Sequence, residues 1–181
     1  MILKNIPFKD YLKLDENEAY IYTYSFKFGY FLNKKENYFG LKPIREYTLG
    51  QVKDAQSMIE VGILIGDIPK LIAVFSTSEL KHIYAQGLVE VFQQLAWIKA
   101  QVEDIIEVER AALVRKLSER EIKAGLERFE VYGSYPQIKA VANAFNQTIE
   151  WARGVSYEDA FVELCYQKDS AEYQSDLMNT K

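Results

Sequence analysis

The sequence is poor in the residues that cross-link or interrupt a chain. Its 181 residues include one cysteine, Cys165, and four prolines. A single cysteine excludes an intramolecular disulfide and fits a reducing compartment, or a virion assembled in one. Four prolines and nine glycines are too few for the many short turns of a sandwich or barrel. These absences favour a helix-rich fold.

The sequence also lacks a strong positive charge and a long apolar run. The net charge is −4 and the pI about 5.2, so nucleic acid is not an expected partner. The longest apolar stretch, around residues 61–75, is interrupted by Gly66, Asp67, Pro69 and Lys70, and cannot form one membrane span. The first residues lack the apolar region of a secretory signal. We expect a cytosolic protein without membrane contact.

Residue patterns for catalysis are missing as well. Glu79 and the single histidine, His82, have the Glu-x-x-His spacing of di-iron bundles, but such a site needs the motif twice. A histidine-based triad would have to use His82, and no Gly-x-Ser-x-Gly, Walker or Gly-x-Gly-x-x-Gly motif occurs. We therefore expect no metal, no cofactor and no enzymatic activity.

Helix-start signals and helical periodicity predict an all-α, multi-helix bundle with one long central helix. Capping boxes occur at Thr48 to Gln51, Ser76 to Glu79 and Ser118 to Glu121. Steps of four and three define one apolar seam, which runs from Tyr84 through Leu88, Val91, Leu95, Ile98, Val102 and Ile105. A second stripe, Val89, Phe92, Ala96, Ala100 and Ile106 beside Trp97, adjoins it. A helix apolar on this much of its surface is either central or a subunit contact.

Further helices are expected along the second half of the chain. Ser118 starts one that reaches about Tyr132, Pro136 opens another, Thr148 begins a short turn that ends at Gly154, and the last helix runs from Tyr157 to about Met178. We expect residues 1–47 to form an aromatic-rich segment that packs on a helical bundle of residues 48–181, within one domain.

The aromatic segment has a ring at every second position from Tyr20 to Tyr30. Alternation and β-propensity favour a strand, whereas the acidic residues Asp15, Glu16 and Glu18 just upstream favour a helix start. The segment is either strand or helix, and we favour helix because a strand lacks evident pairing partners. From this segment and the long helix we predict these protein-interface residues: Tyr20, Tyr24, Phe28, Phe31, Val89, Phe92 and Trp97.

Two stretches in the C-terminal third carry a family resemblance. They are AGLERFEVYGSYPQIKAVANAF, residues 124–145, and SYEDAFVELCYQKDSAEYQSDL, residues 156–177. The matching residues are Ala124, Gly125, Leu126, Phe129, Tyr132, Gly133, Tyr135, Tyr157, Phe161, Leu164, Glu172, Tyr173 and Gln174. This pattern of packing residues, about a third of the chain, resembles small helical bacteriophage proteins of the tail-assembly-chaperone type and related virion proteins.

The resemblance implies protein–protein work during phage morphogenesis. The protein is then either a tail assembly chaperone or a head–tail connector or neck-ring subunit, in the host cytoplasm during assembly and, as a connector, in the virion. Its partners are other virion proteins and further copies of itself. The alternative is a helical regulatory or DNA-binding module, for which the best basic stretch, residues 110–120, is interleaved with glutamates.

Overall fold

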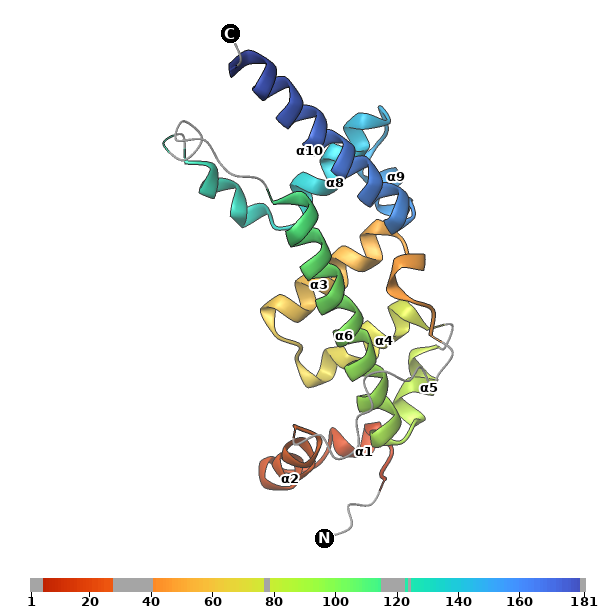
Figure 1. Ribbon diagram of the computed structural model, residues 1–181. Coiled ribbons are helices and arrows are strands. Elements are labelled where there is room, and N and C mark those ends of the chain that lie inside the picture. Colours follow the sequence, from red (N-terminus) through yellow and green to blue (C-terminus); the bar gives the residue numbers. More distant parts are fainter. Residues whose placement is uncertain (1–4, 28–40, 77–78, 115–122, 124, 180–181) are drawn as a thin grey trace. The chain divides into compact units, whose positions relative to one another are not determined.

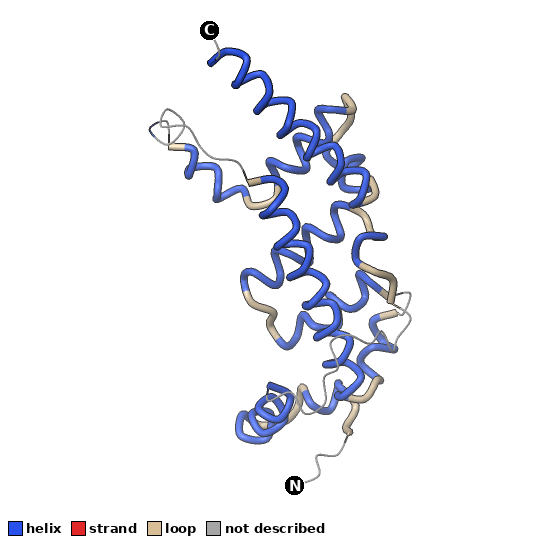
Figure 2. Tube along the Cα trace, in the orientation of Figure 1, coloured by secondary structure: helices blue, strands red, loops and turns tan. Residues whose placement is uncertain are grey.

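The described part of the chain is helical throughout. The computed structural model describes residues 5–27, 41–76, 79–114, 123 and 125–179 (Figure 1). Within these ranges there is no strand (Figure 2), only isolated antiparallel bridges that join Pro7 to Gly87 and Thr48 to Ser156. The predicted all-α class is therefore confirmed.

The elements have the following bounds. The α-helices are α1 Phe8–Tyr11, α2 Glu16–Lys27, α3 Leu49–Val61, α4 Ile68–Phe75, α5 Leu80–Ala85, α6 Leu88–Leu113, α8 Tyr135–Ala144, α9 Ile149–Gly154 and α10 Tyr157–Asn179. Three 3-10 helices, η1 Ile44–Glu46, η2 Ile65–Asp67 and η3 Leu126–Tyr132, lie between them.

The chain divides into two compact units, each made from two separate stretches. Unit 1 consists of Met1–Ile44 and Met58–Glu103, and unit 2 of Arg45–Ser57 and Asp104–Lys181. The chain passes from one unit to the other within η1, within α3 and again within α6.

In unit 1, the short helix α1 places two aromatic side chains in the core. Phe8 and Tyr11 are both buried. The Phe8 ring lies 6.3 Å from that of Tyr84 on α5, and the Tyr11 ring meets Phe92 on α6 edge-on at 6.0 Å. Such ring pairs stabilise a core beyond the area that they bury. The single turn of α1 is thus held against α5 and α6 by the packing of its Phe8 and Tyr11 rings.

The long helix begins later than the periodicity predicted. Tyr84 belongs to the separate helix α5, and α6 starts at Leu88. The break arises because the backbone around Gly87 pairs with the N-terminal segment: Phe8 N donates to Gln86 O at 2.9 Å, and Leu88 N donates to Ile6 O at 2.7 Å. Beyond the break the predicted seam is confirmed, with Val91, Ile98, Val102 and Ile105 buried among its members.

The first turn of α6 is capped by a residue far away in the sequence. The backbone N–H of Val89 donates to Asn5 Oδ1 at 3.1 Å, and Asn5 Nδ2 donates to the Glu90 carboxylate. A Cβ at Gly87 would collide with the Asn5 and Glu90 side chains. A side chain at position 87 would therefore displace the Asn5 and Glu90 side chains from this arrangement.

The aromatic N-terminal segment is helical as far as it is described. α2 begins after Asp15, whose Oδ1 accepts from Glu18 N at 2.9 Å, and it continues to Lys27. This confirms the helical interpretation for residues 16–27. Residues 28–31 lie outside the described ranges.

In unit 2, two capped helix starts lie against each other. The predicted capping box of α3 forms, because Gln51 N donates to Thr48 Oγ1 and Thr48 N donates to Gln51 Oε1 at 3.0 Å. At the start of α10, Asp159 N donates to Ser156 Oγ at 3.1 Å. The bridge between Thr48 and Ser156 joins these two caps. Gly50 allows the approach, since a Cβ there would lie 2.9 Å from Arg153 O.

The predicted starts of α8 and α9 are also found. Pro136 lies in the first turn of α8, and Thr148 Oγ1 caps α9 by accepting from Trp151 N at 3.2 Å. The predicted start at Ser118 lies outside the described residues, and residues 126–132 form the 3-10 helix η3. Gly133, which follows η3, has a positive φ of +50°, a conformation that glycine adopts readily.

Candidate protein-binding site

A buried polar cluster links three helices of unit 2. Lys53 Nζ on α3 donates to both carboxylate oxygens of Glu109 on α6, each at 2.7 Å. Gln56 Nε2 donates to Glu109 Oε2 at 3.1 Å, and the Tyr157 hydroxyl on α10 donates to Oε1 at 2.8 Å. The side chains of Lys53 and Glu109 are only 1% and 11% exposed. The cluster therefore connects α3, α6 and α10 through donors that all point at the Glu109 carboxylate.

The Tyr157 hydroxyl stays protonated in this setting. Burial, together with the neighbouring Glu109 carboxylate, raises the pKa of Tyr157 far above its usual value. A protonated phenol can donate to the carboxylate, whereas a phenolate would face it as a like charge. The hydroxyl thus acts as a structural donor at the start of α10.

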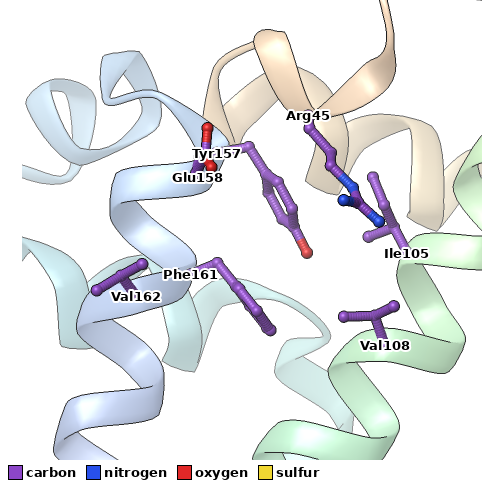
Figure 3. Close-up of a pocket in the computed structure, with 7 residues that line it drawn as sticks. All are labelled: Arg45, Ile105, Val108, Tyr157, Glu158, Phe161 and Val162. Atoms are coloured by element: carbon purple, nitrogen blue, oxygen red, sulfur yellow. The ribbon is translucent and has the colours of Figure 1, made fainter.

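Beside this cluster lies an apolar hollow of about 210 Å³, which also belongs to unit 2. Its walls come from α6 and α10, where Tyr157 and Phe161 point toward Val108 (Figure 3). The Tyr157 and Phe161 rings stack, with centroids 5.9 Å apart and planes at 16°. The complete lining is Arg45, Ile105, Val108, Tyr157, Glu158, Phe161 and Val162. We call this feature the hollow.

Arg45 stands at the edge of the hollow with its guanidinium beside Ile105 (Figure 3). Its side chain is exposed, and no ion-pair partner for it lies among the described residues. The hollow therefore combines apolar walls with one cation, Arg45, and one carboxylate, Glu158.

The exposed side of α10 continues from the hollow as an apolar stripe. Val162, Tyr166, Tyr173 and Leu177 are 63%, 68%, 65% and 51% exposed. At 3.6 residues per turn, their steps of four, seven and four keep them within an arc of roughly 60°. Val162 belongs both to this stripe and to the lining of the hollow. We call these four residues the α10 stripe.

Acidic side chains share this face of α10. Asp169, Glu158 and Asp176 lie along one edge of the stripe, within about 40° of its arc, and all three are exposed. Single exposed apolar residues are normal on protein surfaces. The two tyrosines alone leave on the order of 250 Å² accessible, so the whole stripe is comparable with the largest apolar patch of an ordinary monomer, which is often functional.

The predicted interface residues lie in unit 1. Tyr20 on α2 is exposed, whereas Val89 and Phe92 on α6 are half-buried and Trp97 is buried at 7% exposure. Phe92 already has an internal partner in Tyr11. Tyr24 falls within α2, and Phe28 and Phe31 lie outside the described residues. Their role in an interface stays a prediction.

The α10 stripe was missed at the level of sequence. Only Tyr173 was singled out, as part of the family resemblance. The available signal was the spacing of the four apolar residues together with six carboxylates and one lysine between residues 157 and 179. The spacing alone is ambiguous, since buried Leu164 and Ala160 on α10 follow the same helical rhythm on another side.

Reactive groups are scattered over the described residues. His82 is exposed on α5, and burial raises the pKa of the Cys165 thiol, which disfavours the reactive thiolate. No cluster of three or more histidine, cysteine, aspartate or glutamate side chains suited to a metal occurs within the described ranges. None of the helices described there is both long and apolar enough to cross a bilayer. The basic stretch at 110–120 falls largely outside the described residues.

No protein-family model, curated protein or solved structure matches the chain.

Proposed function

We propose that this protein is a non-enzymatic bacteriophage morphogenesis protein that acts through protein–protein contacts. It serves either as a tail assembly chaperone or as a head–tail connector or neck-ring subunit. Its partners are other virion proteins, and it forms homo-oligomers when it is a ring subunit. It works in the host cytoplasm during assembly and, as a connector, remains in the virion.

The observation that carries the proposal is the α10 stripe beside the hollow. A chaperone or connector must present apolar surface to a companion chain, and the largest apolar patch on a protein surface is often functional. The resemblance to phage proteins supports the same interpretation. Its matching residues Tyr157 and Leu164 are buried on α10, while Tyr173 belongs to the exposed stripe.

The buried cluster suits a scaffold for this surface. Lys53, Glu109 and Tyr157 hold the first turn of α10 against α3 and α6. Rigid support of this kind lowers the entropy cost of binding, because the contact residues are already in place. This structural role of the buried cluster does not require a chemical reaction.

The test is deletion of the gene from its phage genome, with the wild-type gene supplied in trans as a positive control. A chaperone predicts tailless heads after deletion and absence of the protein from purified wild-type particles by mass spectrometry. A connector predicts separate heads and tails, with the protein present at a fixed ratio to other virion proteins.

Matched variants relate the phenotype to the surface. We expect Tyr166→Ser/Tyr173→Ser to fail in complementation and Val61→Ser, which alters an 86% exposed residue of α3, to succeed. Normal particle yield after deletion, with the protein also absent from purified wild-type particles, contradicts the proposed function.

A further inference from the structure

We infer that the α10 stripe and the hollow together bind a basic amphipathic helix of a different polypeptide. This inference rests on the proposed function, because it names the kind of segment that the assembly partner presents. It is carried by the charge of α10, the spacing of the stripe and the size of the hollow.

Charge selects a basic partner. Between Tyr157 and Asn179 the helix has six carboxylates and one lysine, a net charge of −5. The lysine, Lys168, lies on another side of the helix from Tyr166 and Tyr173, and pairs with Asp169 at 3.5 Å and Glu172 at 3.3 Å. Lysine and arginine on a partner complement such a face, whereas acidic side chains are repelled.

The same charges disfavour a second copy of this chain. The stripe has the same spacing in both directions, so an antiparallel copy would bring Tyr166 opposite Tyr173. It would also bring the two Asp169 side chains together near the symmetry axis. Like charges across an interface weaken it. A heterologous partner avoids these contacts.

The dimensions suit a helix. From Val162 to Leu177 the stripe is about 22 Å long at 1.5 Å per residue, the length of roughly four helical turns. A partner helix with apolar residues at steps of three and four can lie along it. The hollow, at about 210 Å³, is below the usual size of a drug-sized ligand pocket and suits one large apolar side chain.

The hollow itself has no charge preference, because its lining contains one cation, Arg45, and one carboxylate, Glu158. We expect the basic residues of the partner near Asp169 and Asp176, and its apolar anchor at the end that enters the hollow.

A display library of random peptides about 20 residues long, matched to the stripe, tests this inference while the partner is unidentified. Peptides are selected for binding to the full chain and counter-selected against Tyr166→Ser/Tyr173→Ser. The affinity of the best peptide is then measured by fluorescence anisotropy for the wild type and for four variants. These are the counter-selection variant, Val108→Trp to fill the hollow, Asp169→Asn/Asp176→Asn to remove charge, and Val61→Ser as the matched control.

The expected peptides combine lysine or arginine with apolar residues at helical spacing. The tyrosine variant weakens binding about 10- to 100-fold, the range of interface hot spots, and Val108→Trp weakens it about tenfold. Asp169→Asn/Asp176→Asn weakens it about 3- to 10-fold at low salt and flattens its salt dependence. Val61→Ser leaves it unchanged. Circular dichroism of each variant confirms that α10 is still folded.

Three results overturn the inference. The first is that the selected peptides are acidic or neutral. The second is that no peptide distinguishes the wild type from the tyrosine variant. The third is that sedimentation velocity shows a dimer of the wild type that the tyrosine variant abolishes. The last result assigns the face to a second copy. The proposed function survives each of these results if deletion of the gene still blocks particle assembly. Failure of the inference can therefore be distinguished from failure of the proposed function.

Discussion

Glu109→Gln is expected to destabilise the protein severely, because it leaves the buried ammonium of Lys53 without a counter-charge. The Lys53 side chain is 1% exposed, and the carboxylate of Glu109 lies 2.7 Å from its ammonium through both oxygens. An amide keeps the shape but removes the compensating charge. Breaking a buried pair in this way costs about 3–5 kcal/mol of unfolding free energy. That is a large share of the roughly 5–15 kcal/mol typical of a folded protein.

The two partners of the pair are not equivalent. Lys53→Met leaves Glu109 with the Gln56 and Tyr157 donors and with 11% exposure. We expect a smaller loss, about 1–3 kcal/mol, for this partly satisfied carboxylate. The double variant Lys53→Met/Glu109→Gln removes both charges and recovers most of the stability lost in Glu109→Gln.

The assay is urea unfolding followed by circular dichroism, with thermal melts as a second measure. In a chain of this length, each kcal/mol shifts Tm by about 2–4 °C. The control is Asp54→Asn, which breaks the Arg153–Asp54 pair of the same unit, with a distance of 2.6 Å but side chains 40% and 56% exposed. Such exposed pairs contribute about 0–1 kcal/mol. If Glu109→Gln costs no more than Asp54→Asn, the buried cluster does not hold the three helices together.

Two further changes test the contacts around the start of α10. Gly50→Ala should lower the free energy of unfolding in urea by about 1–3 kcal/mol, because the new Cβ lies 2.9 Å from Arg153 O. The control, Gly66→Ala, should not destabilise the protein, because a Cβ there meets nothing within 4 Å. Equal effects of the two substitutions would refute the close approach at Gly50. Tyr157→Phe tests the raised pKa of Tyr157. Folding favours its protonated form, so this stabilisation is complete below the unfolded pKa of about 10 and is lost as pH rises above it, by about 1.4 kcal/mol per pH unit. The advantage of the wild type over Tyr157→Phe should therefore shrink between pH 9 and pH 11, and a constant difference would refute it.

Much of the local structure could be predicted because its causes lie within one helical turn. The caps of α3, α9 and α10 use side chains and N–H groups three residues apart, so Thr48, Thr148 and Ser156 indicate their helix starts directly. The seam of α6 was equally visible, since buried residues on one helix face recur every three or four positions. The all-α class follows from these short-range rules.

The site depended on contacts that no short-range rule describes. Lys53 and Glu109 are 56 residues apart in the chain, and the sequence shows only one lysine and one glutamate among many. The break before α6 is imposed by Asn5 and its neighbours, 84 residues away from Val89. The residues 157–179 by themselves determined a helix with apolar side chains on several sides. Only the tertiary structure decided which of those sides α8 and α6 cover. It also left Val162, Tyr166, Tyr173 and Leu177 exposed to solvent. The physical reason is that burial depends on helices distant in sequence, which come together only in the folded unit.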